Sequence, residues 1–285
     1  MSDESKTDQR QGVLAIIGGH EDRKGERVIL REFARRLRGQ KVIISTVASH
    51  EPEGYFDGYR RALDDLGVRD LTELYIEDRS EARDEEKLKE LEEAAGVFFS
   101  GGDQLRIHQQ IGHTPIERLV REIYRRGGVV AGTSAGAAAM GEIMLVEGAS
   151  RESHRIGDIK MAPGLALLRG VIIDQHFAQR GRIGRLLGAV AQNPQLLGIG
   201  IDEDTAIFVE GGKFTVVGNG AVYVVDGAGV THSNIASAKQ ESVLSMYDVR
   251  LHVLSSGDAF DLTTRRPEEV PDVRESHERE IQAQG

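Results

Sequence analysis

A single serine stands among glycines and alanines in the segment VVAGTSAGAAAMG, residues 129–141. Gly132 to Gly136 fits the G-x-S-x-G pattern, in which a sharp turn between a strand and a helix exposes a nucleophilic serine. The helix expected to start at Ala135 would offer free N–H groups to an oxyanion. A small-residue loop that only packs tightly would have the same composition, so the pentapeptide alone leaves both interpretations open.

A serine nucleophile needs a base, and the base needs an acid that orients it. Among nine histidines, we favour His176 in IIDQHF as the base, with His20 as the chief alternative. Glu203 is the expected acid, with Asp202 and Asp204 as less favoured substitutes. The order Ser, His, acid along the chain differs from the Ser, acid, His order of α/β-hydrolases and argues against that fold.

Apolar runs that end in small or polar residues predict the strands that would position these groups. The runs are GVLAIIGG, KVIISTVAS, AGVFFSGGD, GGVVAGTSAG, GVIIDQHF and LGIGIDED. Helical patterns lie between them, such as 114–126 and the charged segment 77–94, which we expect to be one helix. The alternation predicts an α/β fold with a mostly parallel sheet covered by helices on both faces. The carboxyl ends of five strands would then share one rim.

The last third of the chain has a different pattern. Residues 205–227 alternate with period two and are broken by glycine pairs, which predicts C-terminal antiparallel β-hairpins. We expect a single α/β domain over residues 10–265, with polar, flexible tails at 1–9 and 267–285.

Two further stretches at the expected rim could complete a catalytic site. Gly101-Gly102 precedes Asp103, and a backbone N–H from Gly102 or Asp103 could join that of Ala135 in an oxyanion hole. The second stretch is DQHFAQRGRIGRLLGAV, which begins at Asp174 and carries three closely spaced arginines. They are Arg180, Arg182 and Arg185. Guanidinium groups bind carboxylates in a bidentate manner, so this cluster predicts recognition of acidic groups on a substrate.

Composition excludes several classes of function. The chain has 285 residues, no cysteine and a formal net charge of -10. The acidic balance argues against nucleic-acid binding, the short apolar runs argue against a membrane span, and the missing cysteine excludes thiolate chemistry. The polar N-terminal segment suggests no signal peptide, so we expect a cytoplasmic protein.

Together these residues resemble the cyanophycinases of serine peptidase family S51. The resemblance covers most of residues 12–262 and rests on IIGGHEDR, FFSGGDQ, GGVVAGTSAGAAAMG, GVIIDQHFAQRGRIGRL and LGIGIDEDTA. It implies a flavodoxin-like sheet related to class I glutamine amidotransferases. It also implies a triad of Ser134 as nucleophile, His176 as general base and Glu203 as orienting acid.

The resemblance further implies a substrate and a pocket. The substrate would be cyanophycin, a polyaspartate with arginine on each side-chain carboxyl, and the product β-aspartyl-arginine. Roles in the substrate pocket pass to Gln104, Asp174, Gln175, Arg180, Arg182 and Arg185. The family implies a homodimer without metal or cofactor. His20 departs from the family pattern, where we would expect a small residue.

Two other functions stay open at this point. An α-aspartyl dipeptidase of the same family would cut Asp-X peptides instead. An inactive binding module, or a partner module of an amidotransferase, could use the same fold. Amidotransferases normally use a cysteine nucleophile, which this chain does not have.

Overall fold

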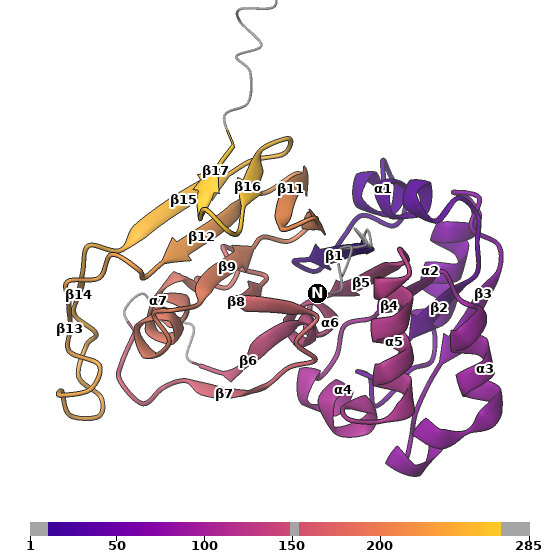
Figure 1. The fold of residues 1–285 in the computed structure, drawn as a ribbon, viewed down its shortest axis with the longest axis horizontal. Helices are drawn as coiled ribbons and strands as arrows, with labels where there is room; N and C mark the ends of the chain where they lie inside the picture. Colours follow the sequence, from indigo (N-terminus) through magenta and orange to yellow (C-terminus); the bar gives the residue numbers. More distant parts are fainter. Residues whose placement is uncertain (1–10, 149–153, 269–285) are drawn as a thin grey trace, which may run out of the picture.

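The computed structural model describes residues 11–148 and 154–268, and its core is built on two β-sheets (Figure 1). Within these residues the first sheet has nine strands in the order β17-β16-β11-β10-β1-β5-β4-β2-β3. Strands β1 (Val13–Ile17), β5 (Val129–Thr133), β4 (Gly96–Phe99), β2 (Val42–Ser45) and β3 (Leu71–Leu74) are parallel. Strands β10 (Thr205–Glu210), β11 (Lys213–Gly218), β16 (Ala259–Asp261) and β17 (Arg266–Pro267) extend it in antiparallel fashion.

The second sheet has the order β15-β12-β9-β8-β6-β7 in the same described part of the chain. Its central strands β6 (Gly141–Glu147), β8 (Leu168–Gln175) and β9 (Leu197–Ile201) are parallel. Antiparallel strands β7 (Lys160–Pro163), β12 (Val222–Asp226) and β15 (Arg250–Leu254) flank them. A separate short hairpin joins β13 (His232–Ser233) to β14 (Met246–Tyr247).

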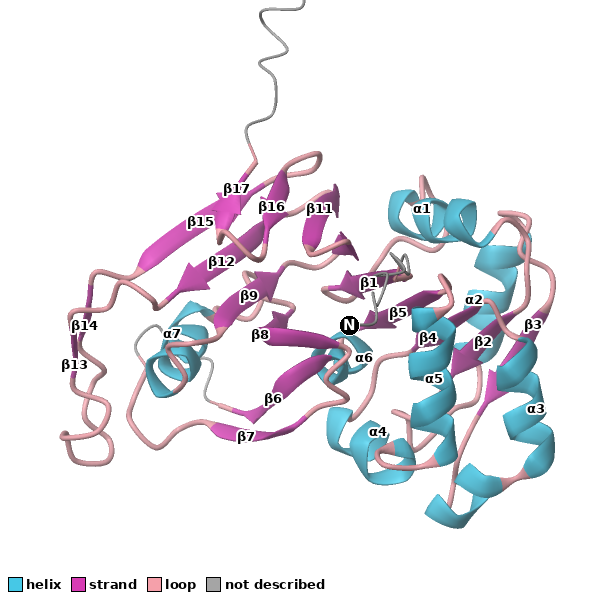
Figure 2. Cartoon of the chain, viewed as in Figure 1, coloured by secondary structure: helices cyan, strands magenta, loops and turns pink. Residues whose placement is uncertain are grey.

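Helices cover both faces of the first sheet (Figure 2). One face packs against α1 (Val28–Leu37) and α2 (Tyr55–Asp64), and the other against α3 (Glu85–Glu93), α4 (Gln104–Ile111), α5 (Pro115–Arg125) and α6 (Ala135–Met140). Helix α7 (Ile183–Gln192) covers the outer face of the second sheet. One continuous apolar core runs from α4 and α5 into the second sheet, so burial of this core holds the two sheets together.

The predicted α/β fold, with parallel strands, flanking helices and C-terminal antiparallel strands, is confirmed. The division into two sheets differs from the single parallel sheet that we expected. The five strand ends are divided between them, because β1, β4 and β5 belong to the first sheet and β8 and β9 to the second. The chain leaves the first sheet through α6 and returns in the turn between β9 and β10. Apolar runs of this kind specify buried strands but not the sheet in which each one pairs.

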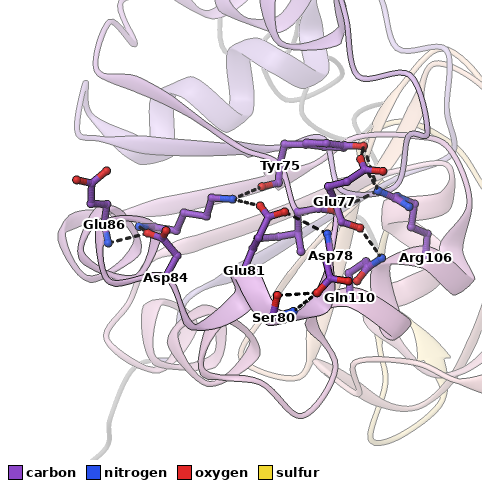
Figure 3. A network of polar contacts seen from close by, with 11 residues as sticks. Tyr75, Glu77, Asp78, Ser80, Glu81, Asp84, Glu86, Arg106 and Gln110 are labelled. Carbon is purple, nitrogen blue, oxygen red and sulfur yellow. Dashed lines mark hydrogen bonds and ion pairs between the residues drawn. The ribbon is translucent and has the colours of Figure 1, made fainter.

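The expected single helix over 77–94 is instead two pieces, a 3-10 helix, η1 (Arg79–Arg83), and α3. Figure 3 shows the cause: the side chain of Asp78 caps the first piece, and that of Asp84 accepts from the N–H groups of Glu86 and Lys87. Aspartate side chains of this kind favour helix starts over helix interiors. Arg106 on α4 donates to the Ile76 carbonyl at 3.1 Å, so the same network ties this connection to α4.

The ends of the chain lie largely outside the described residues. The predicted tail at 1–9 and residues 269–285 belong to the undescribed segments. Strand β17 includes Pro267, and the Glu268 N–H donates to the Ala259 carbonyl at 2.9 Å, so ordered structure reaches two residues into the segment predicted as a tail. In the described ranges, none of the helices combines the length and apolarity needed to cross a membrane.

Candidate active site

Ser134 occupies a strained turn between β5 and α6. Its backbone has φ 52° and ψ -111°, a conformation that non-glycine residues rarely adopt and that clusters at functional sites. The turn is tight: a side chain on Gly132 would overlap the backbone of Gly136, and one on Gly136 would overlap the backbone of Phe99. Both glycines of the G-x-S-x-G pattern are therefore required by close packing, and the turn presents the Ser134 hydroxyl to the cavity.

The side chains of Ser134, His176 and Glu203 form a continuous hydrogen-bonded chain. The Ser134 Oγ lies 2.9 Å from Nε2 of His176, and Nδ1 of His176 lies 2.6 Å from Oε1 of Glu203. His176 follows β8 and Glu203 follows β9, whereas Ser134 follows β5 in the other sheet. The Asp202 carboxylate accepts from the N–H of Ala178, so Asp202 is occupied away from the imidazole.

The backbone of Gly18-Gly19, directly after β1, joins the loops that carry the base and the acid. The Gly18 carbonyl accepts from the His176 N–H at 2.8 Å, and the Gly19 carbonyl accepts from the Asp204 N–H at 2.8 Å. The Gly18 N–H in turn donates to the Thr205 carbonyl at 2.8 Å. These bonds hold the end of β1 against the ends of both β8 and β9, so they fix the relative positions of His176 and Glu203.

His20, the alternative base, lies next to the same acid and not next to the serine. Its Nδ1 is 2.9 Å from Oε2 of Glu203, and its ring meets that of His176 edge-on with 5.0 Å between centroids. One carboxylate therefore contacts two imidazoles, one through each oxygen. His176 is buried and His20 is exposed.

The environment shifts the pKa values of the base and the acid in directions that suit proton transfer. Burial lowers the pKa of His176, and the charge of Arg180 lowers it further, although the bond to Glu203 opposes both. Burial acts to raise the pKa of Glu203, but hydrogen bonds to His176 and His20 outweigh it and lower that pKa. A neutral imidazole beside an ionised carboxylate is the state needed for a general base.

Of the three predicted oxyanion donors, two remain open to a ligand. In the described residues, neither the N–H of Gly102 nor that of Ala135 has a backbone acceptor among the loop and turn bonds. The Asp103 N–H donates to the Ala48 carbonyl at 2.8 Å, and its side chain caps α4. Gly101 lies beside Ser134: a Cβ atom added to Gly101 would be 3.5 Å from the Ser134 Cβ. The N–H pair of Gly102 and Ala135 is therefore the better candidate for an oxyanion hole.

Four of the six predicted substrate residues form a buried cluster beside the triad: Asp174, Gln175, Arg182 and Arg185. Nε of Arg185 donates to Asp174 at 2.6 Å, and Nη1 of Arg182 donates to Asp174 at 3.2 Å and to the Gln175 carbonyl at 2.6 Å. Two guanidinium groups thus share one carboxylate, which leaves an excess positive charge. Burial, with the charges of Arg185 and Arg180, lowers the pKa of Arg182 to about 10 despite the opposing effect of Asp174.

Arg180 and Gln104 differ from that cluster. Arg180 is exposed, and within residues 11–148 and 154–268 it forms no ion pair. The amide of Gln104 donates to the Leu145 carbonyl at 2.9 Å and so links the start of α4 to the second sheet. Arg185 is committed to Asp174, whereas Arg180 is free to meet a ligand.

These groups line a cavity of about 500 Å³. Its wall includes the Ser134 and His176 side chains, Gly102, Gln104 and Gln175, together with Arg23, Arg180, Arg182 and Arg185. Four arginines therefore face one cavity in a protein of net charge -10. Such a concentration of positive charge favours anionic groups on a ligand.

Sequence reasoning assigned no role to Glu21, which is buried in the same wall. Its carboxylate accepts from the Thr133 hydroxyl at 2.6 Å and from the Tyr59 hydroxyl. Arg23 lies over the Tyr59 ring, 5.2 Å from its centroid. Tyr59 is on α2, and nothing in its local sequence indicates that it reaches the cavity. Glu21 ties the residue before the nucleophile to the loop that carries His20.

Comparison with known proteins agrees with this geometry. Residues 14–217 match the sequence model of peptidase family S51. The chain belongs to peptidase family S51. A curated cyanophycinase of Trichormus variabilis is 41% identical over 257 residues, covering 89% of this chain and 86% of the relative. The cyanophycinase of Synechococcus elongatus is 39% identical over 260 residues, covering 90% and 81%. The predicted family and the class of serine-type peptidase are confirmed.

Solved structures extend the likeness at the level of the fold. A peptidase from an acI-B1 actinobacterium aligns with a TM-score of 0.64 at 21% identity, covering 89% of this S51 peptidase and 98% of that chain. A putative peptidase E of Listeria monocytogenes aligns with a TM-score of 0.51 at 18% identity, covering 73% and 99%. At these identities the alignments show the fold alone.

Proposed function

We propose that this S51 peptidase hydrolyses cyanophycin to β-aspartyl-arginine through an acyl-enzyme. The observation that carries the proposal is the hydrogen-bonded chain Ser134–His176–Glu203, with distances of 2.9 and 2.6 Å, at the edge of an arginine-lined cavity. The relatives that are 39–41% identical over most of the chain are named cyanophycinases. Family membership supports the peptidase chemistry, and the cavity supports the choice of substrate.

In the first half of the reaction, His176 removes the proton from the Ser134 hydroxyl as the serine oxygen attacks an aspartyl peptide carbonyl. Glu203 holds the imidazole in the tautomer with its proton on Nδ1 and stabilises the cation that forms. The N–H groups of Gly102 and Ala135 would hold the oxyanion. His176 then gives its proton to the leaving amine, and Ser134 is left as an ester.

In the second half, a water molecule attacks the ester carbonyl while His176 accepts its proton. Collapse of the second tetrahedral intermediate breaks the bond to the serine oxygen, which takes its proton back from His176. The amine released in the first half and the acid released in the second are the dipeptide and the rest of the polymer, and the triad is regenerated. The proton count therefore balances without a metal or a cofactor.

The arginines of the cavity support cyanophycin as the substrate. Each arginine of the polymer is linked through its α-amino group, so it keeps a free α-carboxylate next to the reacting backbone. Arg180 is exposed and unpaired within the described ranges, and the Arg182–Arg185–Asp174 cluster carries excess positive charge. Guanidinium groups bind such carboxylates in a bidentate manner. Gln104 and Gln175 line the same cavity and would contact the substrate's polar backbone.

The test is a digestion with two substrates. Purified protein incubated with insoluble cyanophycin should release soluble β-aspartyl-arginine, identified by mass, whereas Asp-Leu should be cut slowly or not at all. Cleavage of Asp-Leu alone would favour the α-aspartyl dipeptidase. Absence of both activities, together with no labelling of Ser134 by a fluorophosphonate, would favour an inactive binding module.

Two further parts of the proposal concern the protein's oligomeric state and its location in the cell. We expect a homodimer, which light scattering during size-exclusion chromatography would measure. We also expect a cytoplasmic location, which fractionation of the source cells would test. Neither affects the chemistry of the triad.

A further inference from the structure

The second histidine beside the catalytic acid creates a group of metal-binding atoms. His20, His176 and Glu203 each offer one such atom, and these atoms all lie within 4.8 Å of one another. In residues 11–148 and 154–268, no other group of three histidine, aspartate or glutamate side chains meets this condition. The His20 and His176 Nδ1 atoms lie 2.9 and 2.6 Å from the two carboxylate oxygens of Glu203.

We propose that His20, His176 and Glu203 form an inhibitory site for Zn²⁺. Two imidazole nitrogens and one carboxylate are the donor set that zinc takes in sites with three protein ligands and one open position. Zinc accepts nitrogen and oxygen at about 2.0–2.2 Å, so a cation between the rings would replace the two N–H···O bonds with three coordinate bonds. Rotation of the exposed His20 ring can supply the small adjustment that this requires.

The three side chains of the site differ in their exposure to solvent. The His20 side chain is 72% exposed, that of Glu203 is 25% exposed and that of His176 is 3% exposed. A hydrated cation can therefore meet His20 and Glu203 first and reach His176 afterwards. His20 has φ 49°, and this left-handed conformation turns its side chain toward Glu203.

Nearby charges set a limit on the affinity. Glu203 supplies the negative charge of the site, whereas Arg180 acts on His176 as a nearby positive charge. The neighbouring carboxylate of Asp204 is already an acceptor for the N–H of Asp22 and the amide of Asn219. With one carboxylate and one opposing arginine, we expect reversible binding, weaker than that of a closed structural zinc site.

Bound zinc would inhibit by fixing the wrong tautomer of His176. Coordination through Nδ1 leaves the proton of the neutral ring on Nε2, which lies 2.9 Å from the Ser134 oxygen. The ring would then donate to the serine and could not accept its proton. The ring neither gains nor loses a proton overall, because the Nδ1 proton leaves and Nε2 takes one from solvent. This inhibitory step depends on the proposed role of the triad, but the binding of zinc does not.

The experiment compares zinc binding to the full chain with that to two matched variants. His20→Asn removes one ligand at a left-handed position that asparagine tolerates. His113→Asn is the control, because His113 is also exposed, has φ 56° and lies outside the site. Isothermal titration with ZnCl₂ in chelator-free buffer should give one site in the wild type and in His113→Asn. In His20→Asn the dissociation constant should rise on the order of tenfold or more.

A second measurement tests inhibition by zinc in an assay that needs no cyanophycin. The rate at which a fluorophosphonate labels Ser134 should fall with added zinc in the wild type and recover with a chelator. For each variant the labelling rate is divided by its own zinc-free rate. The zinc concentration that halves this ratio should be the same in the wild type and His113→Asn and on the order of tenfold higher in His20→Asn. Equal zinc binding by wild type and His20→Asn, or no binding by either, would overturn the proposal. Failure of cyanophycin hydrolysis with this binding pattern intact would instead count against the proposed substrate.

Discussion

The imidazole of His176 packs directly against the Cα of Gly19. A methyl group on residue 19 would overlap two atoms of the imidazole ring, Cε1 at 2.3 Å and Nε2 at 2.6 Å, and φ at Gly19 is +101°. The Gly19 carbonyl also accepts the Asp204 N–H, next to Glu203. The glycine thus provides both the space for the general base and a backbone contact to the loop that carries the acid.

We therefore predict that Gly19→Ala displaces the His176 ring and lowers kcat by about 100-fold, because a shift of about 1 Å at a catalytic group can cost that much. The fold should survive, with a loss of stability of about 1–2 kcal/mol from the left-handed backbone. Stopped assays of β-aspartyl-arginine release, together with circular dichroism and thermal melting, would measure the two effects.

Gly67→Ala is the matched control for that variant. Gly67 has φ +88°, and a side chain on it would meet no atom within 4 Å. It should show the same backbone penalty with wild-type kcat. Equal losses of kcat in both variants would mean that backbone strain, and not the contact with His176, explains the effect.

Ser134→Ala should lower kcat on cyanophycin by roughly 10⁴-fold or more, as in other serine triads. Only the hydroxyl group is removed, so the melting temperature should change little. Ser45→Ala is a suitable control, because Ser45 is buried in β2 and its hydroxyl has no partner among the described residues. Turnover near that of the wild type in Ser134→Ala would disprove the assigned nucleophile.

The acid limb of the activity profile should report His176. Burial and then the charge of Arg180 lower its pKa below the ordinary 6.5, so the neutral base persists until the pH falls below that value. Arg180→Gln removes the positive charge, so the pKa should rise and the loss of activity should begin at a higher pH. Labelling of Ser134 by a fluorophosphonate across pH 4–8 would measure this without a need for carboxylate binding.

Arg23→Gln serves as the control for this profile, because Arg23 lines the same cavity but is not among the main influences on the His176 pKa. Its acid limb should stay close to that of the wild type. A shift to lower pH in Arg180→Gln would contradict the sign of the expected effect.

Local sequence made Ser134, His176 and Glu203 the favoured candidates for the triad but left alternatives open for the base and the acid. Ser134, His176 and Glu203 each follow a buried apolar run, and strand ends are where such side chains are presented. These side chains meet although they come from two sheets, because the turn after β9 returns to the first sheet and brings Glu203 back beside the end of β1. The division into two sheets depends on which strands pair, and apolar composition does not encode that.

Other features depend on packing that spacing alone does not define. Arg182 and Arg185 were predicted to recognise acidic groups, and both contact Asp174, but their burial follows from how α7 lies on the second sheet. The Asp103 N–H was expected to be free, yet the loop after β4 folds onto Ala48 and uses it. His20 stood out as a departure from the family, but its contact with Glu203 required the actual course of two loops.

The arginine cluster leads to a prediction about stability. Asp174 is 1% exposed and is the carboxylate shared by Arg182 and Arg185, which are themselves buried. Asp174→Asn would leave two buried guanidinium groups without a counter-charge, and such a loss typically costs about 3–5 kcal/mol. The excess charge already present in the cluster would grow, so the free energy of unfolding in urea should fall by that order.

Asp65→Asn provides the comparison, because Asp65 also pairs with an arginine, Arg27, but its side chain is 67% exposed. Solvent screens such a pair, and its removal should cost about 1 kcal/mol or less. A cost for Asp174→Asn no greater than that for Asp65→Asn would mean that the cluster tolerates two adjacent cations without a carboxylate. The difference between the two variants therefore measures how much more the buried Asp174 carboxylate contributes to stability than an exposed carboxylate paired with arginine does.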